Sequence, residues 1–138
     1  MKERLLVDTG ILVSAVVPRD QWSGWTAKTM ESVYDPLYTC EAVLTETWFL
    51  LHKYSYAWQS IAKWIERGHL QVQSPMKDHS SSVLRLIEKY KDLPMSIADA
   101  SLVAMVENDL GDRVFTLDQH FTLYRHSGRR VVPVLMPD

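Results

Sequence analysis

Apolar residues along the chain form short runs with two spacings, one typical of buried strands and one typical of helices. The first run, Leu5-Leu6-Val7, stops at the Asp8-Thr9-Gly10 turn, and a longer run follows over residues 11–17. A buried strand, a tight turn and a helix in this order are typical of the opening unit of a parallel α/β protein. We therefore expect Asp8 at the carboxyl end of the first strand, where open α/β sheets place their ligands.

The same alternation of elements continues to the end of the chain. Strands are predicted over residues 37–40, 70–73, 113–117 and 131–135, and helices over 21–34, 41–54, 55–67, 78–90, 97–110 and 119–125. Pro133 indicates that the last strand lies at a sheet edge, because proline has no N–H for the strand ladder. Strands alternating with helices predict the α/β class, a three-layer α/β/α sandwich with a mainly parallel central sheet.

The composition is that of a globular protein, with 46% hydrophobic and 23% charged residues. The 138 residues are expected to form one domain, 1–138, large enough for a core without stapling disulfides. Cys40 is the only cysteine, which excludes an intramolecular disulfide and a cysteine-based zinc site and fits a reducing cytosol. The apolar runs are too short for a signal peptide or a membrane span, so we expect a cytoplasmic protein.

The net charge is −2, from 15 basic and 17 acidic residues. If the partner is a nucleic acid, the attraction must come from a local basic patch, because the charge of the whole protein does not supply it. Basic residues become more frequent late in the chain, at Arg113, Arg125, Arg129 and Arg130. These four arginines are the candidates for phosphate contacts, although such clusters are often only solvated surface.

A helix that is apolar almost all round carries one acid near its start. Pro94 ends the preceding element, Ser96 is a good N-cap residue, and Asp99 three positions later completes a loose capping box. Asp99 also lies on the same helix face as Leu102 and Val106. It is therefore a helix-capping residue, a metal ligand held inside the fold, or both.

A second acid, Glu46, lies on the apolar side of the helix predicted over 41–54. Val43 precedes it by three positions, and Phe49 and Leu50 follow it by three and four. A carboxylate in the centre of an apolar face is unfavourable unless it is paired or bound to a cation. The other interpretation, a glutamate at the edge of the apolar stripe that reaches solvent, stays open.

The four acids share an economical explanation. Asp8 and Asp118 follow predicted strands, whereas Glu46 and Asp99 lie on helices beside apolar neighbours. One shared acidic pocket accounts for all four, and an oxygen-only cluster suits Mg²⁺ or Mn²⁺. Without a metal, clustered carboxylates repel one another and their pKa values rise, so the cluster is best explained by a divalent ion.

Four blocks of this sequence occur in the order and spacing of PIN domains. They are Val-Asp-Thr-Gly from residue 7, Leu-Thr-Glu-Thr-Trp-Phe-Leu-Leu from 44, Asp-Leu-Pro-Met-Ser-Ile-Ala-Asp-Ala-Ser-Leu-Val-Ala from 92, and Phe-Thr-Leu-Asp-Gln-His-Phe from 115. The third block is the most specific, and the resemblance covers essentially the whole chain. The chain most resembles the VapC-type ribonuclease toxins of bacterial and archaeal toxin–antitoxin pairs.

The resemblance implies an acidic quartet around Mg²⁺ or Mn²⁺, with hydroxyl groups that orient a carboxylate or a water. The quartet would be Asp8, Glu46, Asp99 and Asp118, and the supporting residues would be Thr9 and Thr116. The implied reaction is metal-assisted hydrolysis of RNA phosphodiester bonds, which leaves a 5′-phosphate and a 3′-hydroxyl. Some relatives carry Asp where this chain has Ser96 and His120, so the surroundings of Asp99 and Asp118 are less acidic here.

The resemblance also implies partners. VapC-type toxins act as homodimers, and a cognate antitoxin inserts a segment near the active site. The helical hairpin predicted over 41–67 carries Trp48, Trp58 and Trp64, and it is the docking surface that we expect for such a protein.

Two other function classes fit the sequence less well. A PIN-like RNA-binding or scaffold module without activity would have no use for four clustered acids. A phosphoacceptor receiver domain needs an acidic pair after the first strand and a lysine near the last one, but Asp8 is followed by Thr9 and no lysine comes late. The five histidines show no metal-ligand spacing, and only His120, beside Asp118, is a candidate for a phosphate or antitoxin contact.

Overall fold

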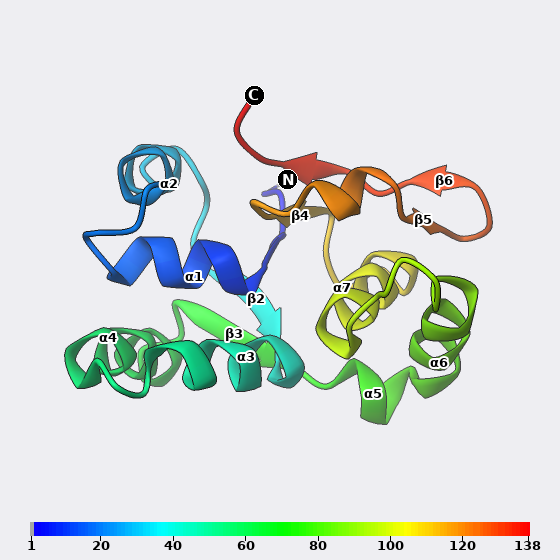
Figure 1. Ribbon diagram of the computed structural model, residues 1–138, viewed down its shortest axis with the longest axis horizontal. Helices are drawn as coiled ribbons and strands as arrows, with labels where there is room; N and C mark the ends of the chain where they lie inside the picture. Colours follow the sequence, from blue (N-terminus) through cyan, green and yellow to red (C-terminus); the bar gives the residue numbers. More distant parts are fainter. Residues whose placement is uncertain (1) are drawn as a thin grey trace.

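The computed structural model describes residues 2–138, and five parallel strands form its central sheet (Figure 1). Strand β1 (Leu5–Val7) lies at the centre, between β2 (Leu37–Cys40) and β4 (Arg113–Phe115). Strand β3 (Leu70–Gln73) pairs with β2, and β7 (Val134–Leu135) pairs with β4. The strand order β3-β2-β1-β4-β7 and the parallel pairing confirm the α/β class.

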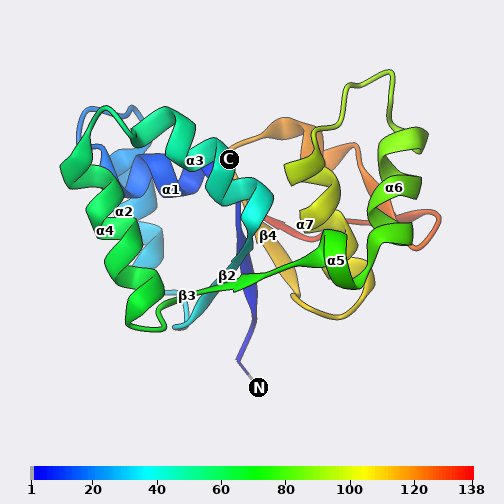
Figure 2. The same ribbon diagram turned by 90° about the horizontal axis from the view of Figure 1, so that it is seen from below.

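Seven helices cover the two faces of this sheet, so the three-layer α/β/α architecture is confirmed for residues 2–138. Figure 2 shows the sheet between two groups of helices. The first group is α1 (Thr9–Val16), α2 (Ser23–Met30), α3 (Glu41–Leu51) and α4 (Ser55–Glu66). The second group is α5 (Pro75–Asp78), α6 (Ser80–Lys89) and α7 (Ile97–Glu107).

The central elements are buried because the sheet has helices on both sides. All three residues of β1 are buried. In α7 the buried residues are Ala98 and all of 100–105, which explains why that helix is apolar almost all round. Gly111 follows α7 at a close approach to the sheet. A Cβ at Gly111 would lie 2.4 Å from Cγ of Leu6, so only glycine fits this position.

Several predicted elements differ from the observed ones in extent or type. The helix predicted over 21–34 is shorter in the structure, where α2 begins at Ser23 and ends at Met30. The helix predicted over 78–90 is observed as α6, which begins at Ser80 because Asp78 is the last residue of α5, a short helix that the sequence did not predict. Within residues 2–138, no helix combines the length and apolar character that crossing a bilayer requires.

The strand predicted over 131–135 is divided. Its first part, β6 (Arg130–Val131), pairs antiparallel with β5 (Arg125–His126) in a small hairpin, and its second part is β7 at the sheet edge. Pro133 lies between them and has no N–H for a ladder, but its carbonyl oxygen accepts a hydrogen bond from the Val114 N–H. The expectation that Pro133 lies at the sheet edge is therefore confirmed.

Candidate metal centre

Four acidic side chains come together at the carboxyl edge of β1 and β4. Asp8 directly follows β1, and Asp118 follows β4 after a two-residue extension. Asp99 lies in the first turn of α7, and Glu46 lies in the middle of α3. All four line one hollow of about 340 Å³, so the tertiary structure brings together the acids that the sequence singled out.

Three of the four acids are spaced as ligands of one ion. Asp8, Asp99 and Asp118 each offer a carboxylate oxygen, and the three oxygens lie within 4.8 Å of one another. Oxygens on opposite sides of an octahedral Mg²⁺ are roughly 4 Å apart, since each Mg–O distance is about 2.1 Å. The spacing and the all-oxygen donor set therefore fit Mg²⁺ or Mn²⁺.

The Asp8 carboxylate is held by two hydrogen bonds. Its Oδ1 accepts from the Thr9 N–H at 2.8 Å, and its Oδ2 accepts from the Thr116 hydroxyl at 2.7 Å. The Thr116 hydroxyl in turn accepts from the Asp118 N–H at 2.9 Å. Since that bond occupies the acceptor side of the hydroxyl, the Thr116 proton points to Asp8, and one threonine connects two of the acids.

Asp99 serves two local roles. Its backbone N–H donates to Oγ of Ser96 at 3.0 Å, so the helix cap expected at Ser96 is confirmed. Its Oδ2 accepts a hydrogen bond of 2.8 Å from the hydroxyl of Tyr124, a contact that the sequence analysis missed. A pattern of apolar positions contains no information on this contact, because the two residues are 25 positions apart on different elements.

Glu46 differs from the other three acids because its side chain is exposed. Its Oε1 accepts a hydrogen bond of 2.8 Å from the Thr9 hydroxyl. Of the two interpretations left open by the sequence, the glutamate at the edge of the apolar stripe is the observed one. Glu46 lies on the rim of the hollow, outside the group of three closely spaced oxygens.

Burial and mutual repulsion change the protonation of the cluster. Burial raises the pKa of Asp8 to about 7, against the opposite effect of the Thr116 hydrogen bond, and the charges of Asp99 and Asp118 raise it further. Burial also raises the pKa of Asp99, where the Tyr124 hydrogen bond acts in the opposite direction. Burial and the hydrogen bond to Asp99 raise the pKa of Tyr124, so its hydroxyl stays protonated and donates. A bound cation would relieve the repulsion among the carboxylates.

Asp118 also caps the helix that follows it. Its Oδ1 accepts from the His120 N–H at 2.9 Å at the start of the 3₁₀ helix η1 (Gln119–Thr122). Nδ1 of His120 lies 3.0 Å from the same oxygen. The structure thus places the His120 ring beside Asp118, at the edge of the cluster.

The four arginines singled out for phosphate contacts have different surroundings. Arg113 is at the amino end of β4, away from the acids, and its guanidinium is paired with Glu3 at 2.8 Å. The Arg125 guanidinium donates to the carbonyl oxygens of Thr122 and Tyr124. Arg129 and Arg130 are exposed on the β5–β6 hairpin. These two side chains have the accessibility that a phosphate contact requires.

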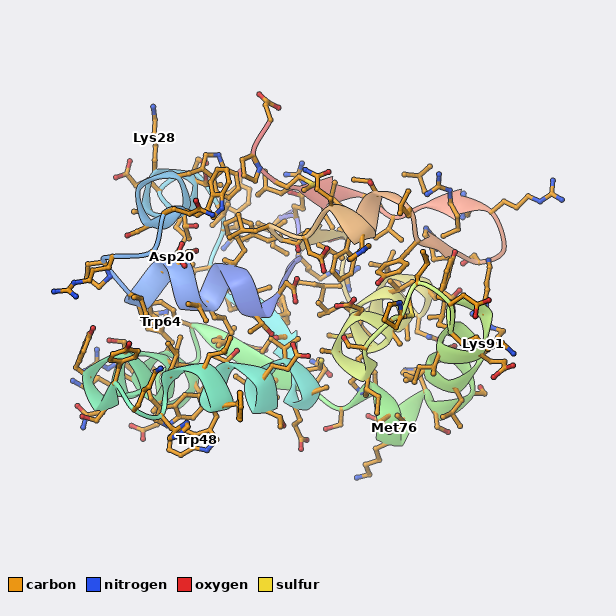
Figure 3. All side chains as sticks on the ribbon, viewed as in Figure 1. Asp20, Lys28, Trp48, Trp64, Met76 and Lys91 are labelled. Atoms are coloured by element: carbon orange, nitrogen blue, oxygen red, sulfur yellow. The ribbon has the colours of Figure 1, made fainter. Side chains whose placement is uncertain are left out.

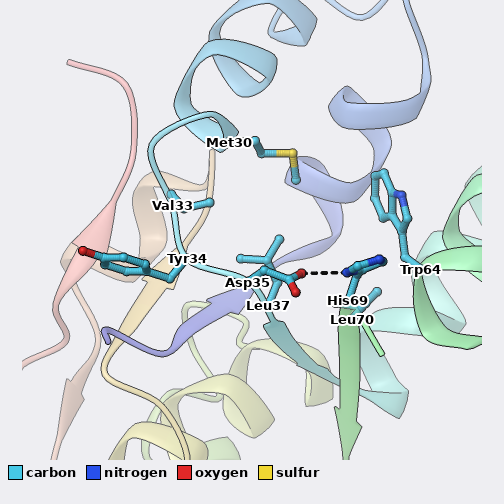
Figure 4. Close-up of a pocket in the computed structure, with 8 residues that line it drawn as sticks. All are labelled: Met30, Val33, Tyr34, Asp35, Leu37, Trp64, His69 and Leu70. Carbon is cyan, nitrogen blue, oxygen red and sulfur yellow. Dashed lines mark hydrogen bonds and ion pairs between the residues drawn. The ribbon is translucent and has the colours of Figure 1, made fainter. Parts of the chain in front are cut away.

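A second hollow, of about 250 Å³, lies at the opposite edge of the sheet, where β2 and β3 begin (Figure 4). Its walls are mostly apolar, with Met30 and Trp64 on two sides. Its one carboxylate, Asp35, is already paired with Nδ1 of His69 at 3.0 Å. This hollow therefore has none of the clustered acids that distinguish the first one.

An exposed apolar surface lies beside the acidic hollow, on α3 and at the start of α4. We call it the α3–α4 apolar face; its members are Trp48, Phe49, Leu50, Tyr54 and Tyr56. Phe49 is 73% exposed, and Figure 3 shows Trp48 on the outer side of α3. Phe49 and Leu50 also line a hollow of about 430 Å³ that shares Thr9 and Glu46 with the acidic one. The apolar face and the acidic cluster are therefore adjacent.

The fold and the site together define an α/β protein with a carboxylate cluster at the carboxyl edge of a parallel sheet. A family model, that of the PIN domain, matches residues 5–126. Since the match spans most of the chain, this protein belongs to the PIN domain family. A comparison with curated proteins finds no match.

Several solved structures have a fold similar to that of this chain. Mycobacterium tuberculosis VapC20, described as a sarcin-ricin loop cleaving toxin, has a TM-score of 0.75 at 19% identity, covering 93% of this chain and 98% of that one. A toxin–antitoxin complex from Klebsiella pneumoniae has a TM-score of 0.67 at 16% identity, with 97% and 98% covered. FitAcB from Neisseria gonorrhoeae has a TM-score of 0.55 at 13% identity, with 83% and 87% covered. At these identities the likeness establishes the shared fold.

Proposed function

We propose that this chain is an Mg²⁺- or Mn²⁺-dependent endoribonuclease, the toxin of a VapBC-like pair, acting in the cytoplasm as a single domain. The observation that carries the proposal is the convergence of Asp8, Asp99 and Asp118 within 4.8 Å. The PIN family match and the similarity to VapC20 and a toxin–antitoxin complex support the choice of an RNA substrate and an antitoxin partner.

Each residue of the site has a part in this proposal. Asp8, Asp99 and Asp118 would hold the ion, and the exposed Glu46 would hold a water molecule by hydrogen bonding on the rim. When bound, Mg²⁺ or Mn²⁺ neutralises phosphate charge and makes water a better nucleophile. Thr116 orients Asp8, and Thr9 orients Glu46, so the carboxylates need little rearrangement when RNA arrives. Hydrolysis by in-line attack of water leaves a 5′-phosphate and a 3′-hydroxyl.

The test is cleavage of purified cellular RNA by the purified protein. We expect cleavage with Mn²⁺ or Mg²⁺, loss of cleavage with EDTA and recovery when the metal is restored in excess, because the carboxylates alone cannot stabilise added negative charge. Ligation that requires a 5′-monophosphate identifies the new ends. Cleavage that persists in EDTA, or products with a 5′-hydroxyl, would contradict the proposal. Absence of both Mn²⁺ binding and cleavage would instead favour a PIN-like scaffold module.

We further propose that the α3–α4 apolar face binds the antitoxin and that the toxin is a homodimer. Exposed aromatic side chains at this density are typical of an interaction surface, and this one adjoins the acidic hollow. Phe49→Ser is expected to lower capture of the antitoxin encoded beside this gene by at least about tenfold in a pull-down. Leu84→Ser, at a similarly exposed apolar position on α6, is the matched control and should leave capture unchanged.

Light scattering on the purified chain tests the homodimer. A dimer of 16.0 kDa chains has a mass of 32 kDa (2 × 16.0), whereas a 16.0 kDa particle would contradict the dimer. In the pull-down, equal capture of the antitoxin by Phe49→Ser and by Leu84→Ser would exclude the α3–α4 apolar face as the antitoxin site.

A further inference from the structure

Tyr124 lies at the acidic cluster although its side chain belongs to the core. It follows the 3₁₀ helix η1, and its relative exposure is 0%. Its hydroxyl donates to Oδ2 of Asp99 at 2.8 Å. The phenol therefore connects the interior of the protein with one of the three acids that fit a metal ion.

The position of this hydroxyl is set by the surrounding aromatic rings. The Tyr124 ring contacts Tyr90 with ring centroids 5.2 Å apart and Phe121 in an edge-to-face arrangement at 5.3 Å. The His120 ring lies roughly parallel to it at 6.5 Å. Tyr90 is itself held, since its hydroxyl accepts a hydrogen bond from the Arg125 N–H at 2.7 Å. A ring packed in this way has little freedom to move its hydroxyl away from Asp99.

The direction of the hydrogen bond is also determined. An ionised carboxylate can only accept, so the phenol must be the donor. Its bond occupies Oδ2 of Asp99 and restricts rotation of the carboxylate. The other two acids of the group are held in the same way, Asp8 by the Thr116 hydroxyl and Asp118 by the His120 N–H. Each acid thus has at least one fixed donor.

We infer that Tyr124 is a positioning residue of the metal centre, which holds Asp99 in the orientation that binds the ion. The inference rests on the proposed function for the presence of that ion. Removing such a supporting hydrogen bond typically lowers metal affinity by about 10- to 100-fold. In the alternative, Asp99 serves only as the acceptor that the buried Tyr124 hydroxyl needs. Removing that hydroxyl would then leave metal affinity unchanged.

The experiment measures Mn²⁺ binding by calorimetry for four proteins: wild type, Tyr124→Phe, Asp99→Asn and the double variant. We expect Tyr124→Phe to weaken Mn²⁺ binding by about 10- to 100-fold relative to wild type. In the Asp99→Asn background the same substitution should have little further effect, because Tyr124 acts through Asp99. Tyr38→Phe is the control, since it removes the hydroxyl of a half-buried tyrosine on β2 that does not line the acidic hollow.

Two results would overturn the inference: Mn²⁺ affinity equal to wild type in folded Tyr124→Phe, or an equal loss of affinity in Tyr38→Phe. If wild type cleaves RNA and binds Mn²⁺ while Tyr124→Phe binds it equally well, the proposed function stands and the role of Tyr124 falls. If wild type neither binds Mn²⁺ nor cleaves RNA, both fall.

A measurement on wild-type protein covers the case in which Tyr124→Phe does not fold. The Tyr124 hydroxyl proton, held by a carboxylate in the interior, should give a slowly exchanging NMR resonance that shifts on saturation with Mg²⁺. A resonance that Mg²⁺ leaves unmoved would also overturn the inference.

Discussion

Asp8→Asn is expected to lower metal-dependent RNA cleavage by more than about 100-fold while the fold is retained. The substitution keeps the size of the side chain and an oxygen that can accept from Thr9 or Thr116, but it removes the charge. Loss of a direct ligand should exceed the 10- to 100-fold effect typical of a supporting residue. The measurement is the single-turnover cleavage rate at saturating Mn²⁺, with circular dichroism to confirm the fold.

Two further variants complete this test. Asp99→Asn removes the charge from another element of the cluster and should have an effect of similar size. Asp92→Asn makes the same chemical change at an exposed position before α7 and should leave the rate unchanged. Wild-type rates in both purified cluster variants would remove the acidic cluster as the catalytic centre.

The second large effect concerns the stability of the metal-free protein. Burial raises the pKa of Asp8 from its ordinary value of 3.8 to about 7, so the folded protein binds more protons than the unfolded chain between these two pH values. The free energy of unfolding must then fall as pH rises through this window. At about 1.4 kcal/mol per pKa unit, ionisation of Asp8 should lower the free energy of unfolding by about 2 to 3 kcal/mol as the pH rises from 5 to 8.

Urea unfolding in EDTA, at pH 5 and pH 8, measures this effect. Asparagine does not ionise, so Asp8→Asn should lack this loss of stability. The free energy of unfolding of Asp8→Asn minus that of wild type should therefore be about 2 to 3 kcal/mol larger at pH 8 than at pH 5. At pH 8, saturating Mg²⁺ should stabilise wild type more than Asp8→Asn, since a ligand of the folded state shifts the equilibrium by mass action. An equal difference between the two proteins at both pH values would show that Asp8 does not titrate in this window.

Elements with a clear hydrophobic period were predicted with the right position. Strands β2 and β3 occupy 37–40 and 70–73 as predicted, because each has turn or helix-starting residues on both sides. Boundaries failed where the apolar period continued through a break in the backbone. The apolar pattern of 78–90 gave α6 but not the short helix α5 before it, and Pro133 marks the sheet edge without indicating the β5–β6 hairpin.

The candidate site was predictable for a similar reason. Carboxylates at strand ends or within apolar stripes conflict with the local pattern, and such conflicts are expected at functional sites. Asp8 and Asp99 were found in this way. Tyr124 was not, because a tyrosine among apolar residues agrees with a core position and nothing in the pattern indicates where its hydroxyl points.

By itself, the amino-acid sequence determined the order of the main elements, the α/β class and the choice of the four acids, since these depend on periodicity and on residue type. Only the tertiary structure decided that three acids converge while Glu46 stays on the rim, that Arg113 is paired with Glu3, and that Tyr124 donates to Asp99. The physical reason is distance. A carboxylate cluster or a buried hydrogen bond joins residues far apart in the chain, and chain packing alone sets the separations of a few ångströms on which metal binding depends.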